Sequence, residues 1–143
     1  MISRPSDRKG GAGGTANAGA DVAANRGPVE TATYINAAQK WAMENTRLGI
    51  PMIMHEEALH GLVAPGATSF PQSIALASTW NPGLLEKIFS VAAAEARARG
   101  ANLVLAPVVD VARDPRWGRI EETYGEDPYL VSEMGLAAIR GFQ

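Results

Sequence analysis

The stretch from Asp110 to Pro128 holds the densest group of side chains that could do chemistry. Its sequence is D-V-A-R-D-P-R-W-G-R-I-E-E-T-Y-G-E-D-P, with three arginines, six carboxylates and one tryptophan. It follows the apolar run Leu103–Val109, which predicts a buried strand, and ligands in α/β proteins bind in loops after the carboxyl ends of strands. Arginine forks pair strongly with carboxylates. Two interpretations follow: a polar ligand site, or a network of salt bridges that only shapes the loop.

A second polar cluster is His55-Glu56-Glu57-Ala58-Leu59-His60-Gly61. A zinc-protease helix needs histidines four residues apart, but these two are five apart, about 140° around a helix. The sequence therefore predicts no metal site, and no cofactor motif is present. A carbohydrate site fits better, because carboxylates and arginines bind sugar hydroxyls while aromatic rings cover the apolar face of a sugar.

Cap residues and prolines predict the helices that position these clusters. Three helices are expected: Pro28 to about Arg47, Asn81-Pro82 to Gly100, and one that starts at Asp127-Pro128. Gly49 is expected to form a left-handed cap after the first helix, and Trp80 a hydrophobic staple with Leu85. The expected buried stripes are Leu84, Leu85, Ile88, Val91 and Ala92 on the second helix, and Leu130, Val131, Met134, Ala137 and Ala138 on the third.

Two apolar runs, residues 50–54 and 103–109, predict strands, and the second is apolar enough for a parallel strand covered on both faces. Helices alternate with these strands, which predicts an α/β fold with a parallel sheet. Both charged clusters then lie at the carboxyl edge of the sheet, the active-site face of a (β/α) barrel. A complete barrel needs about 250 residues, so the 143 residues here predict a sector of a TIM-type barrel, with its first βα units only.

Composition excludes several classes of partner and chemistry. The net charge of −2 does not favour nucleic acid or an anionic membrane. The chain has no cysteine, so it has no disulfide or thiolate site. No signal peptide or transmembrane segment is visible, which favours the cytoplasm and leaves the oligomeric state open. Residues 1–27 are rich in glycine, and we expect a disordered leader there, followed by one domain over residues 28–143.

The segment R-D-P-R-W-G-R-I-E-E-T-Y-G-E-D-P resembles the signature of family 3 glycoside hydrolases of the β-glucosidase and β-xylosidase type, and the resemblance extends over residues 27–143. It implies the first part of an N-terminal catalytic (β/α)8 barrel. The implied activity is retaining hydrolysis of β-linked glucose or xylose at non-reducing ends. The implied substrate is a small β-linked oligosaccharide or an aryl or alkyl glycoside.

The resemblance also implies roles for individual residues. Glu57 and Arg119 match positions that bind hydroxyls of the glycone, the sugar on the non-reducing side of the cleaved bond. Glutamate followed by Ala-Leu-His-Gly leans towards the xylosidase-like branch. The alternative is a direct Glu57–Arg119 ion pair without a ligand. We expect site-shaping roles for His60, Asp114, Trp117 and Glu122, although Trp117 could also stack on a sugar.

The family's catalytic residues have no match in this sequence. A retaining glycosidase uses a carboxylate nucleophile and a separate acid/base, and the family also uses a Lys-His pair that binds substrate. None of the three lysines precedes a histidine. We therefore expect a fragment with part of the glycone site and no activity of its own. The alternatives are a stand-alone sugar-binding module and a structural or interaction domain with a salt-bridged loop.

Overall fold

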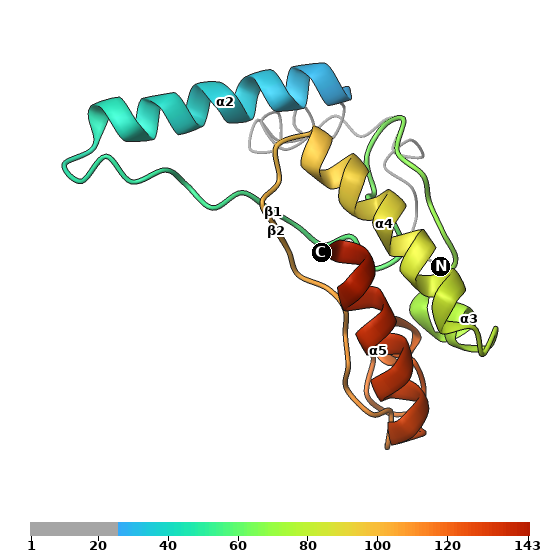
Figure 1. Cartoon of the computed structure of the whole chain (residues 1–143). Helices are drawn as coiled ribbons and strands as arrows, with labels where there is room; N and C mark the ends of the chain where they lie inside the picture. Colours follow the sequence, from blue (N-terminus) through green and yellow to red (C-terminus); the bar gives the residue numbers. More distant parts are fainter. Residues whose placement is uncertain (1–25) are drawn as a thin grey trace, which may run out of the picture.

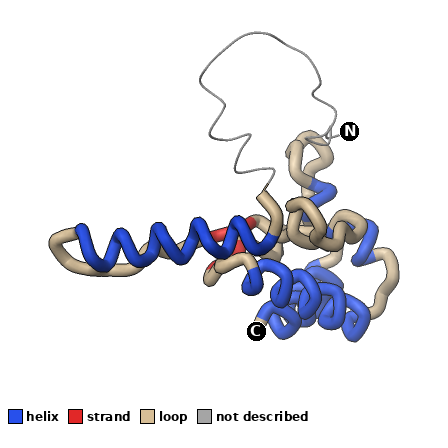
Figure 2. Tube along the Cα trace, turned by 90° about the horizontal axis from the view of Figure 1, so that it is seen from above, coloured by secondary structure: helices blue, strands red, loops and turns tan. Residues whose placement is uncertain are grey.

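The computed structural model describes residues 26–143, so the expected glycine-rich leader lies outside the described residues except for Arg26 and Gly27. The elements are α2 (Pro28–Asn45), β1 (His55–Glu56), α3 (Ser73–Ala77), α4 (Pro82–Ala98), β2 (Leu103–Val104), the 3-10 helix η2 (Ile120–Glu122) and α5 (Pro128–Phe142). Their order confirms the predicted alternation of helices and strands, with α3 as an additional short helix. The described part of the chain is mostly helical (Figure 2).

The predicted helix starts are confirmed. The Asn81 side chain accepts a hydrogen bond from the Leu84 amide at 3.1 Å, and Asp127 accepts one from the Leu130 amide at 2.8 Å. Each satisfies an amide that has no partner within its helix. The first helix ends at Asn45, two residues earlier than predicted. Gly49 takes the left-handed conformation, with φ +61°, in the turn beyond that end.

The core lies between α4 and α5, which pack side by side (Figure 1). The predicted α5 stripe is confirmed, with Leu130 partly buried and the other four residues buried. The predicted α4 stripe is confirmed in part. Leu85 and Ala92 are buried and Ile88 is partly buried, whereas Leu84 and Val91 are exposed, and Phe89 and Ala96 complete the buried face. The Trp80–Leu85 staple is wrong. Trp80 has φ +52° and is 72% exposed, because this backbone conformation directs its ring into solvent.

The sheet within the described residues consists of β1 and β2, which pair in parallel with His55 opposite Leu103. The parallel direction confirms the prediction, but the strand positions differ. β1 begins at His55, directly after the predicted strand of residues 50–54, and β2 covers only the start of the predicted 103–109. Residues 50–54 form no strand, because the Gln39 side chain bonds both the amide and the carbonyl of Met52 at 2.8 and 2.7 Å. β2 stops at Val104, and Pro107 beyond it has no amide to donate.

The predicted cover on both faces of the second strand is also wrong. Leu103 and Leu105 remain 44% and 46% exposed. In Figure 1 the strand pair lies between α2 on one side and the α4–α5 layer on the other. α2 projects away from that layer, and the chain returns from its far end in an extended conformation.

Candidate functional site

The parallel strand pair brings the two polar clusters to one edge of the sheet. The Leu105 amide donates to the Glu56 carbonyl at 2.8 Å, which ties the end of β1 to the residues after β2. Glu57 follows β1 directly and its side chain is exposed. The loop of residues 110–127 follows the extended continuation of β2. Because parallel strands end at the same edge, both loops leave from one side.

Arg119 lies in the second loop and is held by Glu122. Its Nε and Nη2 donate to Glu122 Oε2 at 3.0 and 2.6 Å. This hydrogen-bonded partner raises the pKa of Arg119, and the carboxylates of Asp110 and Glu57 add smaller contributions in the same direction. Arg119 therefore lies within electrostatic reach of Glu57 without forming an ion pair with it. The partner that the structure gives Arg119 is Glu122, not the alternative partner Glu57.

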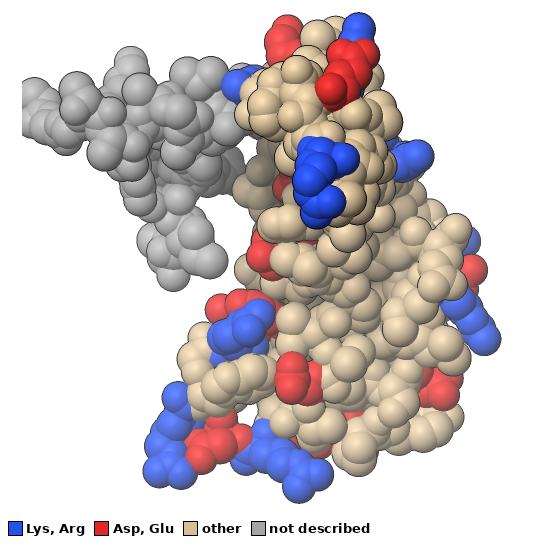
Figure 3. All heavy atoms as spheres, turned by 90° about the vertical axis from the view of Figure 1, so that its left-hand side faces the viewer, with Lys and Arg blue, Asp and Glu red and all other residues tan. Residues whose placement is uncertain are grey.

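A second ion pair shapes the beginning of the same loop. Arg116 donates from its backbone amide to Asp114 Oδ1 at 3.0 Å and from its guanidinium to both carboxylate oxygens. The side-chain hydrogen bond, followed by the backbone one, holds the pKa of Asp114 below its ordinary value. The loop is thus braced by local pairs, in agreement with part of the salt-bridge interpretation. Figure 3 shows oppositely charged side chains gathered at the lower end of the molecule, where this loop lies.

The core anchors both ends of this braced loop. The Ala112 amide donates to the Gly125 carbonyl at 3.0 Å and closes its neck. Tyr124 is buried beside α3, and burial raises the pKa of its hydroxyl. Trp117 is 37% exposed, so its ring is accessible at the tip.

His60 is placed in the first loop, where its ring binds the backbone. Nδ1 donates to the Phe70 carbonyl oxygen at 3.1 Å. This contact shapes the loop and leaves the ring half-buried. Asp110 is a further charged residue near Arg119 that was not among the predicted site residues, and its carboxylate contributes to the raised pKa of Arg119. Its position as the first polar residue after the apolar run 103–109 could have indicated it.

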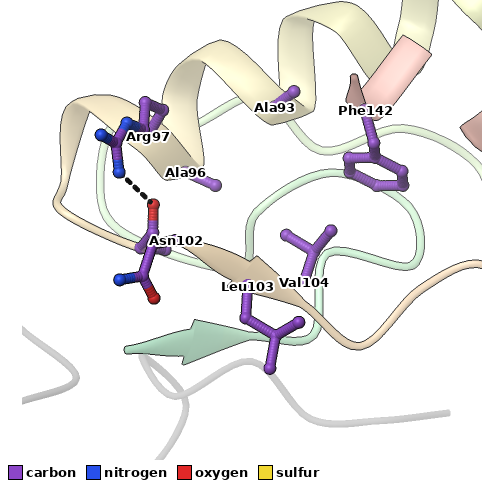
Figure 4. Close-up of a pocket in the computed structure, with 8 residues that line it drawn as sticks. Ala93, Ala96, Arg97, Asn102, Leu103, Val104 and Phe142 are labelled. Atoms are coloured by element: carbon purple, nitrogen blue, oxygen red, sulfur yellow. Dashed lines mark hydrogen bonds between the residues drawn. The ribbon is translucent and has the colours of Figure 1, made fainter. Parts of the chain in front are cut away.

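An open pocket of about 260 Å³ is lined by residues of α4 and β2, by Ala101 and Asn102 between them, and by Phe142 (Figure 4). Neither Glu57 nor Arg119 lines it. Residues 26–143 contain no group of three or more histidine, aspartate or glutamate side chains that could hold a metal ion. None of the described helices is long and apolar enough to cross a membrane.

Two parallel strands joined through helices, each followed by a charged loop, define a domain of the α/β class. The model of the glycosyl hydrolase family 3 N terminal domain matches residues 9–143. The chain belongs to this family, as the R-D-P-R-W-G-R segment predicted. Solved structures similar to the chain are glycoside hydrolases with the TIM-barrel type of domain, which supports the predicted α/β fold class.

Named relatives include both xylosidases and glucosidases. A beta-xylosidase from Formosa agariphila is 52% identical over 108 residues, which cover 71% of this chain and 15% of that protein. A β-glucosidase structure from Erythrobacter marinus has a TM-score of 0.78 and 43% identity, and the match covers 82% of this chain and 16% of that one. A Listeria innocua beta-glucosidase variant in complex with laminaribiose has a TM-score of 0.71 and 37% identity, covering 78% and 15%. The chain therefore spans about 15% of the length of these relatives.

Proposed function

We propose that Glu57 and Arg119 bind the glycone of a β-linked glucoside or xyloside, as part of a retaining β-glucosidase or β-xylosidase. The observation that carries this proposal is their meeting at one edge of the strand pair. Glu57 lies close enough for its carboxylate to raise the pKa of Arg119, yet Arg119 bonds Glu122 instead. Both side chains are exposed, they follow neighbouring parallel strands, and they do not pair with each other. A carboxylate and a guanidinium in this arrangement suit a ligand with several hydroxyls.

The two side chains have complementary hydrogen-bonding capacity. A carboxylate accepts from sugar hydroxyls, and a guanidinium donates to their oxygens. Glu122 uses the Nε and Nη2 protons of Arg119 and fixes the plane of the fork. Nη1 forms no hydrogen bond within the described residues and is available to a sugar oxygen. The partner we propose is thus a small β-linked oligosaccharide or an aryl or alkyl glycoside.

We further propose that residues 28–143 form one domain, the first part of a (β/α)8 barrel, and that β1 and β2 are the first two strands of that barrel. Their parallel pairing supports this arrangement, as does the likeness to TIM-barrel-type family members. A glutamate at position 57 favours xylosides over glucosides. Its side chain is longer than an aspartate at the same position would be, so it leaves less room beside the sugar, and a pentose lacks the hydroxymethyl group that would need this room. The Formosa agariphila relative carries the name beta-xylosidase, which agrees with this preference.

We propose that this chain carries residues that bind the sugar but not the carboxylates that cleave the glycosidic bond. Retaining hydrolysis needs a nucleophile and an acid/base about 5 to 5.5 Å apart. No carboxylate of this chain matches the family's nucleophile. We therefore expect the 143-residue chain to bind glycosides without cleaving them.

The test compares the purified wild-type chain with Glu57→Gln and with Glu133→Gln, a control on the exposed side of α5. Methyl β-D-xyloside and methyl β-D-glucoside are titrated by NMR, and release of nitrophenol from the matching aryl glycosides is recorded. We expect the wild-type chain to bind the glycosides saturably. Glu57→Gln should weaken this binding about tenfold or more, because one charged hydrogen-bond partner is lost. Glu133→Gln should bind as tightly as wild type. Nitrophenol release that Glu57→Gln abolishes would overturn the assignment of a purely binding role.

A second candidate function is a structural domain braced by its charged loop. The Asp114–Arg116 and Arg119–Glu122 pairs favour it. It predicts that neither glycoside binds and that Arg119→Ala lowers the thermal stability of the chain. Binding that depends on Glu57 would exclude it.

A further inference from the structure

The loop that follows Glu57 is closed on itself at its neck. The Phe70 amide donates to the His60 carbonyl at 2.7 Å, and the His60 ring donates back to the Phe70 carbonyl. Gly61 lies against the opposite side of this neck with φ +94°, where an added Cβ would lie 2.2 Å from the Thr68 carbonyl oxygen. The neck is therefore a fixed crossing of two backbone segments, a few residues from Glu57.

The far side of the loop is tied to α4 by two side chains. Thr68 donates from its amide to Glu95 Oε2 at 2.9 Å and from its hydroxyl to Glu95 Oε1 at 2.8 Å. The Arg99 guanidinium donates to the Pro65 carbonyl. Glu95 lies in the last turn of α4, and Arg99 is the residue that caps the C-terminus of this helix in a helical conformation. Their spacing of four residues directs both side chains to the same side. The loop runs along α4 in Figure 1, in agreement with these contacts.

Packing alone does not account for an arginine at position 99. The residue is only 4% exposed. Burying a guanidinium costs free energy unless the charge is hydrogen-bonded, and an apolar residue would fill the same volume without that cost. The hydrogen bond to Pro65 is therefore the specific contribution of an arginine here. It fixes the backbone of the loop rather than the core.

The loop is coupled to Glu57 through Ala58. Ala58 is buried and has φ +51°, a conformation that is strained for any residue with a Cβ. Such a conformation persists only where the surroundings enforce it. The closed neck and the two ties to α4 supply that constraint. A change in Ala58 towards an ordinary conformation would redirect the backbone beside Glu57 and with it the Glu57 side chain.

We propose that Glu95 and Arg99 are positioning residues that hold Glu57 in its binding geometry through the loop of residues 58–70. The inference rests on the proposed function, because it assigns Glu57 to glycone binding. The proposal adds two residues at the C-terminal end of α4 that act on the site through the loop rather than by contact with the sugar. It also explains why the α4 face towards the loop carries an acid and a buried arginine.

The test uses Glu95→Ala and Arg99→Met, their conservative counterparts Glu95→Gln and Arg99→Lys, and Met134→Ala. Met134 is fully buried between α4 and α5, so its variant serves as a control that is destabilised far from the loop. Hydrogen exchange of the amides of residues 57–61 is measured relative to α5 amides. Affinity for methyl β-D-xyloside and methyl β-D-glucoside is measured under the same conditions.

We expect Glu95→Ala and Arg99→Met to raise the relative exchange of residues 57–61 and to weaken glycoside binding by about tenfold, since a loosened loop misplaces a binding group. Glu95→Gln and Arg99→Lys should recover most of both quantities. Met134→Ala should lower the melting temperature and leave both quantities close to wild type.

Two results would overturn the positioning role. One is faster exchange at residues 57–61 with unchanged affinity. The other is an equal loss of affinity in Met134→Ala at matched stability, which would indicate a structural role only. Failure of the proposed function is distinguishable, because wild type and Glu57→Gln would then bind equally poorly while the loop amides still respond to Glu95→Ala. The positioning role would fall with it.

Discussion

Charged residues in the second loop pair with near neighbours in sequence. Asp114 pairs with Arg116, and Arg119 pairs with Glu122. Exposed ion pairs of this kind contribute little to global stability, because solvent screens them. Their effect is local: they fix the direction of each guanidinium and the path of the backbone. The site is thus pre-oriented before a ligand arrives, which lowers the entropic cost of binding.

The Asp114–Arg116 pair gives the loop a defined dependence on pH. The pKa of Asp114 is depressed, mainly by the Arg116 side chain and secondarily by its amide. The pairing therefore stabilises the loop above the unfolded-state pKa of Asp114 and is lost as the pH falls through the lower, folded-state pKa. Arg116→Gln should move the Asp114 pKa up towards its ordinary value. The NMR titration of the Asp114 carboxyl carbon checks this.

Arg113→Gln is the matched control for that titration, because it removes the same charge from the same loop without removing a hydrogen bond to Asp114. We expect it to shift the Asp114 pKa far less than Arg116→Gln does. Equal shifts in the two variants would mean that net charge, rather than the hydrogen bond, sets the value.

The α4–α5 contact is the element-scale feature that supports the site, because α4 holds the first loop and α5 follows the second. Two glycines of α5 allow its close packing. A Cβ on Gly141 would lie 2.5 Å from the Glu86 carbonyl oxygen, and one on Gly135 would lie 2.8 Å from Val109 Cγ1. The Phe89 and Phe142 rings pack 4.9 Å apart beside Gly141.

Gly141→Ala should therefore destabilise the chain by roughly 1 to 3 kcal/mol, the usual cost of overpacking. The added methyl group meets backbone of α4, which cannot rotate away as a side chain could. Urea unfolding monitored by circular dichroism measures the effect. Gly83→Ala is the control, because the nearest atom to its added Cβ is Asn81 Oδ1 at an ordinary 3.6 Å. A neutral Gly141→Ala would show that the helices can move apart freely.

The sequence predicted the helices well because their signals are local. Asn81 and Asp127 mark helix starts through contacts three residues away. The strands were predicted less well, because their extent depends on partners far along the chain: Gln39 binds Met52 and removes it from any ladder. The roles proposed for Glu57 and Arg119 rest on sequence motifs. The contacts of Glu95 and Arg99 with the first loop could not be predicted, because only the fold brings these residues together.

At the scale of the whole molecule, several elements of the described chain expose large apolar side chains to solvent. Trp41, Ile53, Leu103 and Leu105 are large and substantially exposed. They belong to α2, the extended segment after it, and the strand pair with its continuation. Exposed apolar patches and unpaired strand edges favour association.

We expect the isolated chain to bind the dye ANS and to sediment with a concentration-dependent mass. Leu103 and Leu105 are two residues apart and so lie on the same face of the strand. Replacing both with lysine should lower dye binding and association. Tyr129→Lys is the control, since Tyr129 is exposed at the start of α5, outside α2 and the strand pair. If the double variant associates as strongly as wild type, Leu103 and Leu105 do not mediate the association.

The small size of the strand pair has a consequence for the order in which parts of the chain open. β1 meets β2 across a long separation in sequence, and the Met54 amide is bound by an Asn102 side chain 48 positions away. The α4–α5 contacts span comparable separations, such as Phe89 with Phe142 and Glu86 with Gly141, but they bury most of the core. The strand pair has two residues in each strand, and Leu103 is 44% exposed. Local opening is easiest where few apolar contacts are buried. We therefore expect the strand edge that carries Glu57 to open before the helix pair does under stress.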